Sequence, residues 1–109
     1  MEVHSERNGQ VRRALIKSTD MPIEMQQDAV DMCCAAIDEI DNDREVAALL
    51  KKEFDRRYSP CWQCLVGNHF GSYLTHLKGH FIHFVLMGRA VVLFKAIKPG
   101  DPSGDVITA

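Results

Sequence analysis

Apolar residues recur at helical spacing in the first half of the chain. In residues 22–40 they fall three or four positions apart, and Pro22 suits a helix start that the preceding Asp20 favours through its charge. In residues 44–58 they fall four positions apart, and Pro60 ends that stretch because it cannot continue the hydrogen-bond ladder. The pattern predicts two helices with apolar faces formed by Met25, Ala29, Met32 or Cys33, Ala36 and Ile40, and by Val46, Leu50, Phe54 and Tyr58.

The second half of the chain reads as short apolar strands. A further short strand is predicted before the helices, within residues 11–19. Residues 69–76 differ from the other strands because they mix Gly, Ser, Thr and His with Phe and Tyr, which favours a sheet edge that another peptide can join. The four strands after the helices, with glycines at their joints, are predicted over residues 61–66, 69–76, 80–86 and 89–96.

A chain of 109 residues favours one domain, which we place at residues 13–96. Residues 1–12 show little periodicity and are predicted to form a flexible arm. Residues 97–109 contain Pro-Gly and Pro-Ser-Gly and are predicted to form a disordered tail.

Charge and hydropathy argue against two classes of partner. The net charge is −2 with histidine neutral, and acidic residues flank most basic pairs, so there is no basic stripe for nucleic acid. No apolar run approaches the ~20 residues that a membrane span requires. The polar residues 1–10 lack the apolar core of a signal peptide. We therefore expect no nucleic-acid or membrane partner, and a reducing cytosolic or cytoskeletal location in which the cysteines stay thiols.

Cys61 and Cys64 form the pattern C-x-x-C, which occurs in redox sites and zinc sites. Within a strand, however, residues three apart point to opposite faces, so a disulfide would require distortion. Buried thiols are the favoured interpretation, and thiol redox or zinc chemistry at this pair is the alternative function.

Other signs of catalysis or metal binding are weak. His80 and His83 would lie on opposite faces of one strand, which makes a shared metal ion with His76 awkward. Ser72 lacks the G-x-S-x-G turn of hydrolases, and no glycine-rich phosphate loop is present. We expect no enzymatic activity, no metal and no cofactor.

Long segments of the sequence resemble one protein family in register. Residues 51–76 read KKEFDRRYSPCWQCLVGNHFGSYLTH and closely resemble the eight-kilodalton dynein light chains. Residues 20–30 (DMPIEMQQDAV), 80–86 (HFIHFVL) and 93–95 (LFK) match the same family. The resemblance spans about residues 14–95 without a gap, so the chain is identified as a member of that family.

The resemblance implies an α+β fold in which two helices pack on an antiparallel β-sheet, within a strand-swapped two-fold homodimer. The strand matching residues 69–76 would cross to the partner's sheet and offer its free edge to an extended client peptide. Clients would be short linear motifs, often with a central Gln flanked by Thr or Val, and they would add a strand in a groove formed by both chains.

The resemblance also assigns site residues. The client Gln would cap the start of the second helix, and His83 and Val85 stand where many members have Tyr. The dimer interface would include Gln63, Tyr73, Leu74 and Thr75. The peptide-binding positions would be Asp43, Arg44, His69, Phe70, Gly71, Ser72, Tyr73, Leu74, Thr75, His76, Phe81, His83, Val85 and Ala90.

The function that follows is a non-catalytic light chain of dynein motor complexes, cytoplasmic or axonemal. It would act as a dimeric hub that binds the dynein intermediate chain and other proteins with Gln-containing motifs, and it would promote dimerisation of its clients. A narrower role, as a fixed structural subunit of one motor with few other clients, remains open.

Overall fold

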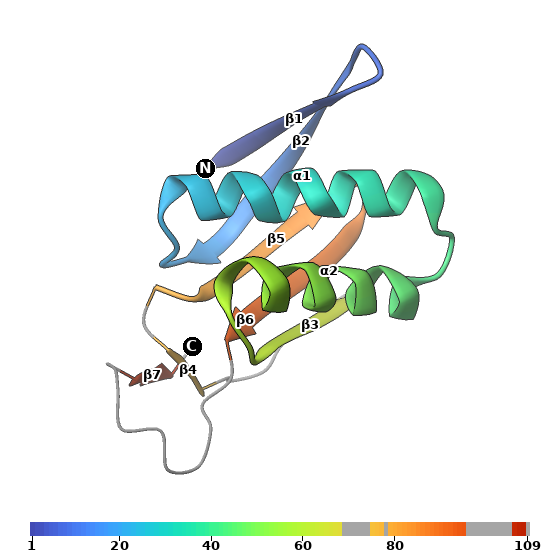
Figure 1. Ribbon diagram of the computed structural model, residues 1–109. Coiled ribbons are helices and arrows are strands. Elements are labelled where there is room, and N and C mark those ends of the chain that lie inside the picture. Colours follow the sequence, from blue (N-terminus) through green and yellow to red (C-terminus); the bar gives the residue numbers. More distant parts are fainter. Residues whose placement is uncertain (69–74, 78, 96–105, 109) are drawn as a thin grey trace.

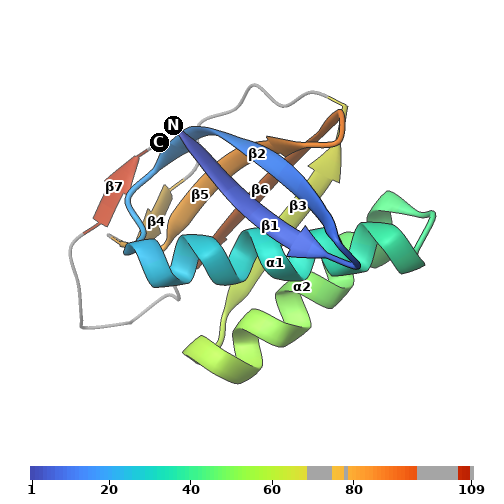
Figure 2. The ribbon, with the colours of Figure 1, turned by 90° about the horizontal axis from the view of Figure 1, so that it is seen from above.

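Two helices lie on one face of a five-stranded antiparallel sheet (Figures 1 and 2). The computed structural model describes residues 1–68, 75–77, 79–95 and 106–108. The helices are α1 (Ile23–Glu39) and α2 (Asp43–Tyr58). In spatial order the strands are β1 (Glu2–Arg7), β2 (Gln10–Thr19), β5 (Phe81–Leu86), β6 (Arg89–Lys95) and β3 (Trp62–Gly67). A separate two-stranded sheet pairs β4 (Thr75–Leu77) with β7 (Val106–Thr108).

The structure confirms the predicted α+β fold and both helices. The apolar face of α2 is buried at Val46, Leu50 and Phe54, as the four-residue spacing predicted. Neither α1 nor α2 is long and apolar enough to cross a membrane. One detail differs. The side chain of Asp20 accepts the backbone N–H groups of Gly79 and Phe81, at 2.9 and 3.0 Å, and so joins the start of β5 to the approach to α1.

Aromatic rings fill the core between α2 and β3. Trp62 and Phe54 are both fully buried, and their ring centroids lie 4.9 Å apart in an edge-on arrangement. The ring of Tyr58 lies 5.0 Å from that of Phe54. Ser59 and Pro60 end α2 shortly before Trp62. Trp62, the first residue of β3, therefore places its side chain in this cluster at the point where the strand begins.

The carboxylate of Asp55 fixes the junction between α2 and β3. It accepts the backbone N–H of Trp62 at 2.7 Å and the ammonium of Lys51 at 2.8 Å. Burial on its own raises the pKa of the Asp55 carboxyl, but these two hydrogen bonds, together with the positive charges of Lys51 and Lys95, outweigh it and lower the pKa below its ordinary value of 3.8. The ionised carboxylate therefore stabilises the fold above the unfolded-state pKa, and this contribution is lost as the pH falls through the folded-state pKa.

We expect Asp55→Asn to lower the free energy of unfolding at neutral pH by about 1 kcal/mol, because Asn keeps an acceptor but loses the charge. The difference from the native protein should start to shrink as the pH falls below the unfolded-state pKa of ~4, and it should vanish below the lower folded-state pKa, where both proteins carry a neutral group. Thermal unfolding across pH measures this. Asp41→Asn, an exposed change between the helices, is the control. A deficit independent of pH would contradict the assignment.

The N-terminus corrects one prediction. Residues 1–12 were expected to be a flexible arm, but β1 pairs with β2 as a hairpin in which Arg7 lies opposite Gln10. The two intervening residues, Asn8 and Gly9, both have positive φ, at 54° and 78°. Asn-Gly is the sequence that such a tight hairpin turn favours, because both residues tolerate the left-handed conformation. Hydrophobic periodicity does not detect such a turn, but the Asn-Gly dipeptide predicts it.

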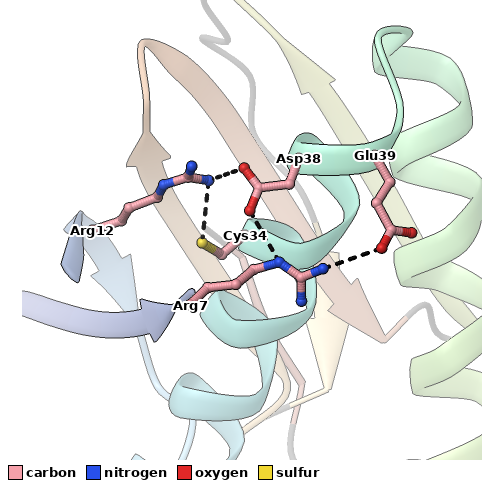
Figure 3. Close-up of polar contacts among 5 residues, drawn as sticks. All are labelled: Arg7, Arg12, Cys34, Asp38 and Glu39. Carbon is pink, nitrogen blue, oxygen red and sulfur yellow. Dashed lines mark hydrogen bonds and ion pairs between the residues drawn. The ribbon is translucent and has the colours of Figure 1, made fainter. Parts of the chain in front are cut away.

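Ion pairs hold this hairpin against the end of α1 (Figure 3). Arg7 contacts Asp38 at 3.0 Å and Glu39 at 3.1 Å. Arg12 pairs with Asp38 and also lies 3.6 Å from the sulfur of Cys34. Acidic side chains are unfavourable at the C-terminal end of a helix, where the dipole is negative. The two arginines offset that charge and tie β1 and β2 to α1.

The C-terminus corrects a second prediction. Residues 97–109 are predicted to be disordered, but Val106–Thr108 form β7; the other residues of this range lie outside the described part of the chain. These are three consecutive β-branched residues, which pack well on a pleated sheet and have high strand propensity. The predicted strand over residues 69–76 is described only at Thr75 and His76, within β4, and its first six residues lie outside the described part of the chain.

Candidate functional site

The candidate residues on β5 and β6 share the sheet face that points away from the helices. Ile82, Phe84 and Leu86 are fully buried on the helix side of β5. Successive strand residues point to opposite faces, so Phe81, His83 and Val85 lie on the other side. Ala90, directly opposite Val85 on β6, joins them, so the structure brings together Phe81, His83, Val85 and Ala90.

Apolar side chains continue across this face, which we call the open face. Leu65 lies opposite Val92 on β6, and Leu15 lies opposite Val85 on β5. Leu65 and Leu15 are 42% and 43% exposed, which is high for large apolar side chains on a sheet. Gln63, predicted at the dimer interface, lies two residues before Leu65 on the same face. Within this face Phe81, Ala90 and Val92 are buried, and the exposed large apolar side chains are Leu15 and Leu65 at its two sides. The open face comprises Leu15, Gln63, Leu65, Phe81, His83, Val85, Ala90, Val92 and Phe94.

The predicted client-binding strand is only partly described. Thr75 and His76 lie in β4 and pair with β7. Six further candidates, among them the dimer-interface candidates Tyr73 and Leu74, lie outside the described residues: His69, Phe70, Gly71, Ser72, Tyr73 and Leu74.

The start of α2 carries the remaining two candidates. The side chain of Asn42 caps this helix by accepting the backbone N–H of Glu45 at 3.1 Å. Among the described residues, no acceptor contacts the backbone N–H groups of Asp43 and Arg44, so both can receive a carbonyl oxygen. The side chain of Asp43 pairs with Arg89, which ties the helix start to the first residue of β6.

Sequence reasoning missed Asn42 and Arg89. The cap had a local signal, since Asn followed three residues later by Glu resembles a helix-start pattern. The Asp43–Arg89 pair had none, because it joins residues that are distant in sequence.

The cysteines do not favour the thiol alternative. All four are free thiols, and Cys64 packs against the core beside the helices. Burial is the main cause that raises the pKa of Cys64, and it raises that of Cys33 to about 12. A redox or zinc-binding cysteine needs the opposite shift, because the thiolate is the reactive form. Within the described residues, no group of three or more His, Cys, Asp or Glu side chains is arranged to hold a metal ion.

Known proteins match this chain over most of its length. The family model for dynein light chain type 1 matches residues 13–96. A protein described as "Dynein light chain" from Schistosoma mansoni is 52% identical over 85 residues, which are 78% of this chain and 96% of that protein. The chain belongs to the dynein light chain family. Its role is therefore that of a dynein light chain.

Solved structures agree on the fold of this dynein light chain. The dynein light chain-like domain of the Fasciola hepatica calcium binding protein FhCaBP2 has a TM-score of 0.63 at 20% identity, covering 79% of this chain and 93% of that one. A mercury derivative of the same domain has a TM-score of 0.61 at 21% identity, covering 78% of this chain and 93% of that one. Both β1 and β7 of this dynein light chain lie outside the range that the family model matches.

Proposed function

We propose that this dynein light chain is a non-catalytic homodimer that binds short linear peptide motifs by β-strand addition. Its clients would be the dynein intermediate chain and other proteins with Gln-containing segments. It would act at the cytoskeleton, on cytoplasmic or axonemal dynein. By holding two clients side by side, it would act as a hub that promotes their dimerisation.

The observation that supports this proposal is the strand pairing of β4. β4 stands outside the five-stranded sheet and takes up an antiparallel partner from a distant part of the chain. Its main-chain donors and acceptors are therefore able to receive an added strand. Backbone pairing of this kind supplies affinity without dictating sequence, and side-chain pockets supply selectivity.

The open face and β3 support the homodimer. Among the described strands, β3 pairs only with β6, so the outer edge of β3 can receive a strand from a second chain. Leu65 lies on β3 and contributes an exposed apolar side chain to the open face. Leu15, at the other side of the face, is also exposed, and exposed large apolar side chains on one sheet face favour an interaction site. A second copy that inserts its own 69–76 segment would cover the face and complete the groove.

Magnitudes favour a modest single-site affinity. A client that forms about six backbone hydrogen bonds gains ~3–9 kcal/mol before the cost of ordering the peptide. Micromolar affinity requires about −8 kcal/mol. Two parallel grooves that hold a bivalent client would raise the avidity by a factor of roughly 10²–10⁴.

The test is calorimetry with a peptide centred on Thr-Gln-Thr. We expect binding of one peptide per chain with a Kd on the order of micromolar. A peptide of the same sequence with alternate backbone amides N-methylated is the matched control, because it keeps every side chain but loses the donors that strand addition requires. We expect the control to bind at least tenfold more weakly.

One protein variant and a panel of peptides sharpen this test. His76→Ala should weaken binding while the protein stays dimeric; equal affinity would remove His76 from the site. If the N-methylated peptide binds as tightly as the unmodified one, recognition does not proceed by strand addition. A panel of unrelated Gln-containing peptides separates the hub from a subunit dedicated to one motor, because a hub binds many of them.

A further inference from the structure

The C-terminal strand β7 occupies an edge of β4, the strand that we expect to receive the client. Figure 1 shows the two strands side by side, apart from the five-stranded sheet. Their antiparallel register places Thr75 opposite Thr108, His76 opposite Ile107 and Leu77 opposite Val106. One flank of a strand pairs with one neighbour at a time, because each donor and acceptor on that flank is used once. A client that needs this flank must displace β7.

We propose that Val106–Thr108 act as an internal competitor that holds the client-binding edge until a client replaces them. This inference rests on the peptide-binding function proposed above and adds regulation of the same site. The family model ends at residue 96, before this strand begins. The competitor is therefore carried by a segment that follows the matched region.

The sequence around β7 suits a tethered competitor. Val106, Ile107 and Thr108 are all β-branched, which favours the extended conformation that pairing requires. Residues 96–105 join β6 to β7 and include two prolines and two glycines. A tether of ten residues between the two strands gives β7 a local concentration at β4 on the order of millimolar. If the free tail bound with a Kd of about 0.1 mM, this local concentration would weaken client binding about tenfold.

The composition of the tail sets which clients would displace it. Residues 96–109 contain no glutamine. The tail can therefore pair with β4 but lacks the side chain that would cap the N–H groups of Asp43 and Arg44. A client with a correctly placed Gln would gain both interactions. A client must therefore bind more tightly than β7 does in order to displace it. Extended segments that offer only backbone pairing would compete poorly with the tail.

The experiment compares three forms of the full chain. The first is the native protein. The second carries Val106→Gly, Ile107→Ser and Thr108→Gly, which keep the length and charge of the tail but remove its strand propensity. The third carries Ile107→Val, which keeps the β-branched character. The measurements are the Kd of the Thr-Gln-Thr peptide, hydrogen exchange of the β4 amides, and the dimer dissociation constant.

We expect the triple variant to bind the peptide about tenfold more tightly than the native protein. Its β4 amides should exchange faster in the absence of peptide, and the Ile107→Val protein should behave like the native one in both respects. Equal peptide affinity in all three proteins would overturn the inference while leaving the proposed function intact. A tighter dimer with unchanged peptide affinity would also overturn it, because β7 would then occupy the flank used for dimerisation. Absence of peptide binding in all three would instead refute the proposed function.

Discussion

Replacing Phe54 with alanine is expected to destabilise the folded domain by about 3–5 kcal/mol. The ring of Phe54 is fully buried; its centroid lies 4.9 Å from that of Trp62 in an edge-on arrangement and 5.0 Å from that of Tyr58 in a tilted one. Alanine would remove these contacts and leave a cavity that the rigid junction between α2 and β3 cannot close. Domains of this size have a total stability of roughly 5–15 kcal/mol, so the variant should lie close to its unfolding limit.

Urea denaturation at a fixed protein concentration measures this loss, because the proposed dimerisation would make apparent stability depend on concentration. Lys52→Ala on the exposed side of α2 is the matched control and should change stability by less than ~0.5 kcal/mol. Phe54→Leu should fall between the two, since it keeps much of the buried volume. An unfolding midpoint for Phe54→Ala equal to that of the control would show that α2 does not anchor the core.

The helices and the central strands could be predicted because their signals are local and repeated. Val46, Leu50 and Phe54 recur at four-residue spacing, and that period alone places them on one buried face. Pro60 ends α2 by its covalent structure, whatever surrounds it. β5 and β6 were apolar, glycine-bounded segments whose length fits a strand better than a helix.

The two chain ends were mispredicted because pairing, not composition, decides their structure. Residues 1–12 are polar, but the Asn8–Gly9 turn lets β1 pair along the edge of β2, where polar side chains can face solvent. Val106–Thr108 follow a Pro- and Gly-rich stretch whose composition is typical of disorder, and they form a strand by pairing with β4. The pairing of Arg7 with Asp38 and the register of β7 on β4 join residues that are distant in sequence, so no periodic pattern in the sequence predicts them.

The sequence predicts which residues belong to the candidate site, but it does not predict how they are arranged in space. Phe81, His83 and Val85 were assigned by resemblance, and strand alternation then places all three on the open face. The helix cap by Asn42 had a short signal. The pairing of Arg89 with Asp43 depends on the turn that joins β5 and β6, so it could be found only from the three-dimensional structure.

Replacing Leu65 with lysine is expected to weaken dimerisation at least a hundredfold while leaving each chain folded. Leu65 is 42% exposed in the single chain, so a lysine there can keep its charge in water. In the proposed dimer the same position is covered by the second chain, and burying an unpaired ammonium costs several kcal/mol. Peptide affinity should fall with the dimer, because the groove is formed by both chains.

Leu49→Lys provides a matched control, since Leu49 is 37% exposed but lies on α2, on the opposite side of the sheet from the open face. Circular dichroism should show both variants folded, and sedimentation should show Leu49→Lys dimeric and Leu65→Lys monomeric. The pair separates a general effect of added charge from an effect of position. If Leu65→Lys sediments as a dimer, the open face is not the interface. The exposure of Leu15 and Leu65 would then need a different partner to explain it, and strand exchange through β3 would lose its support.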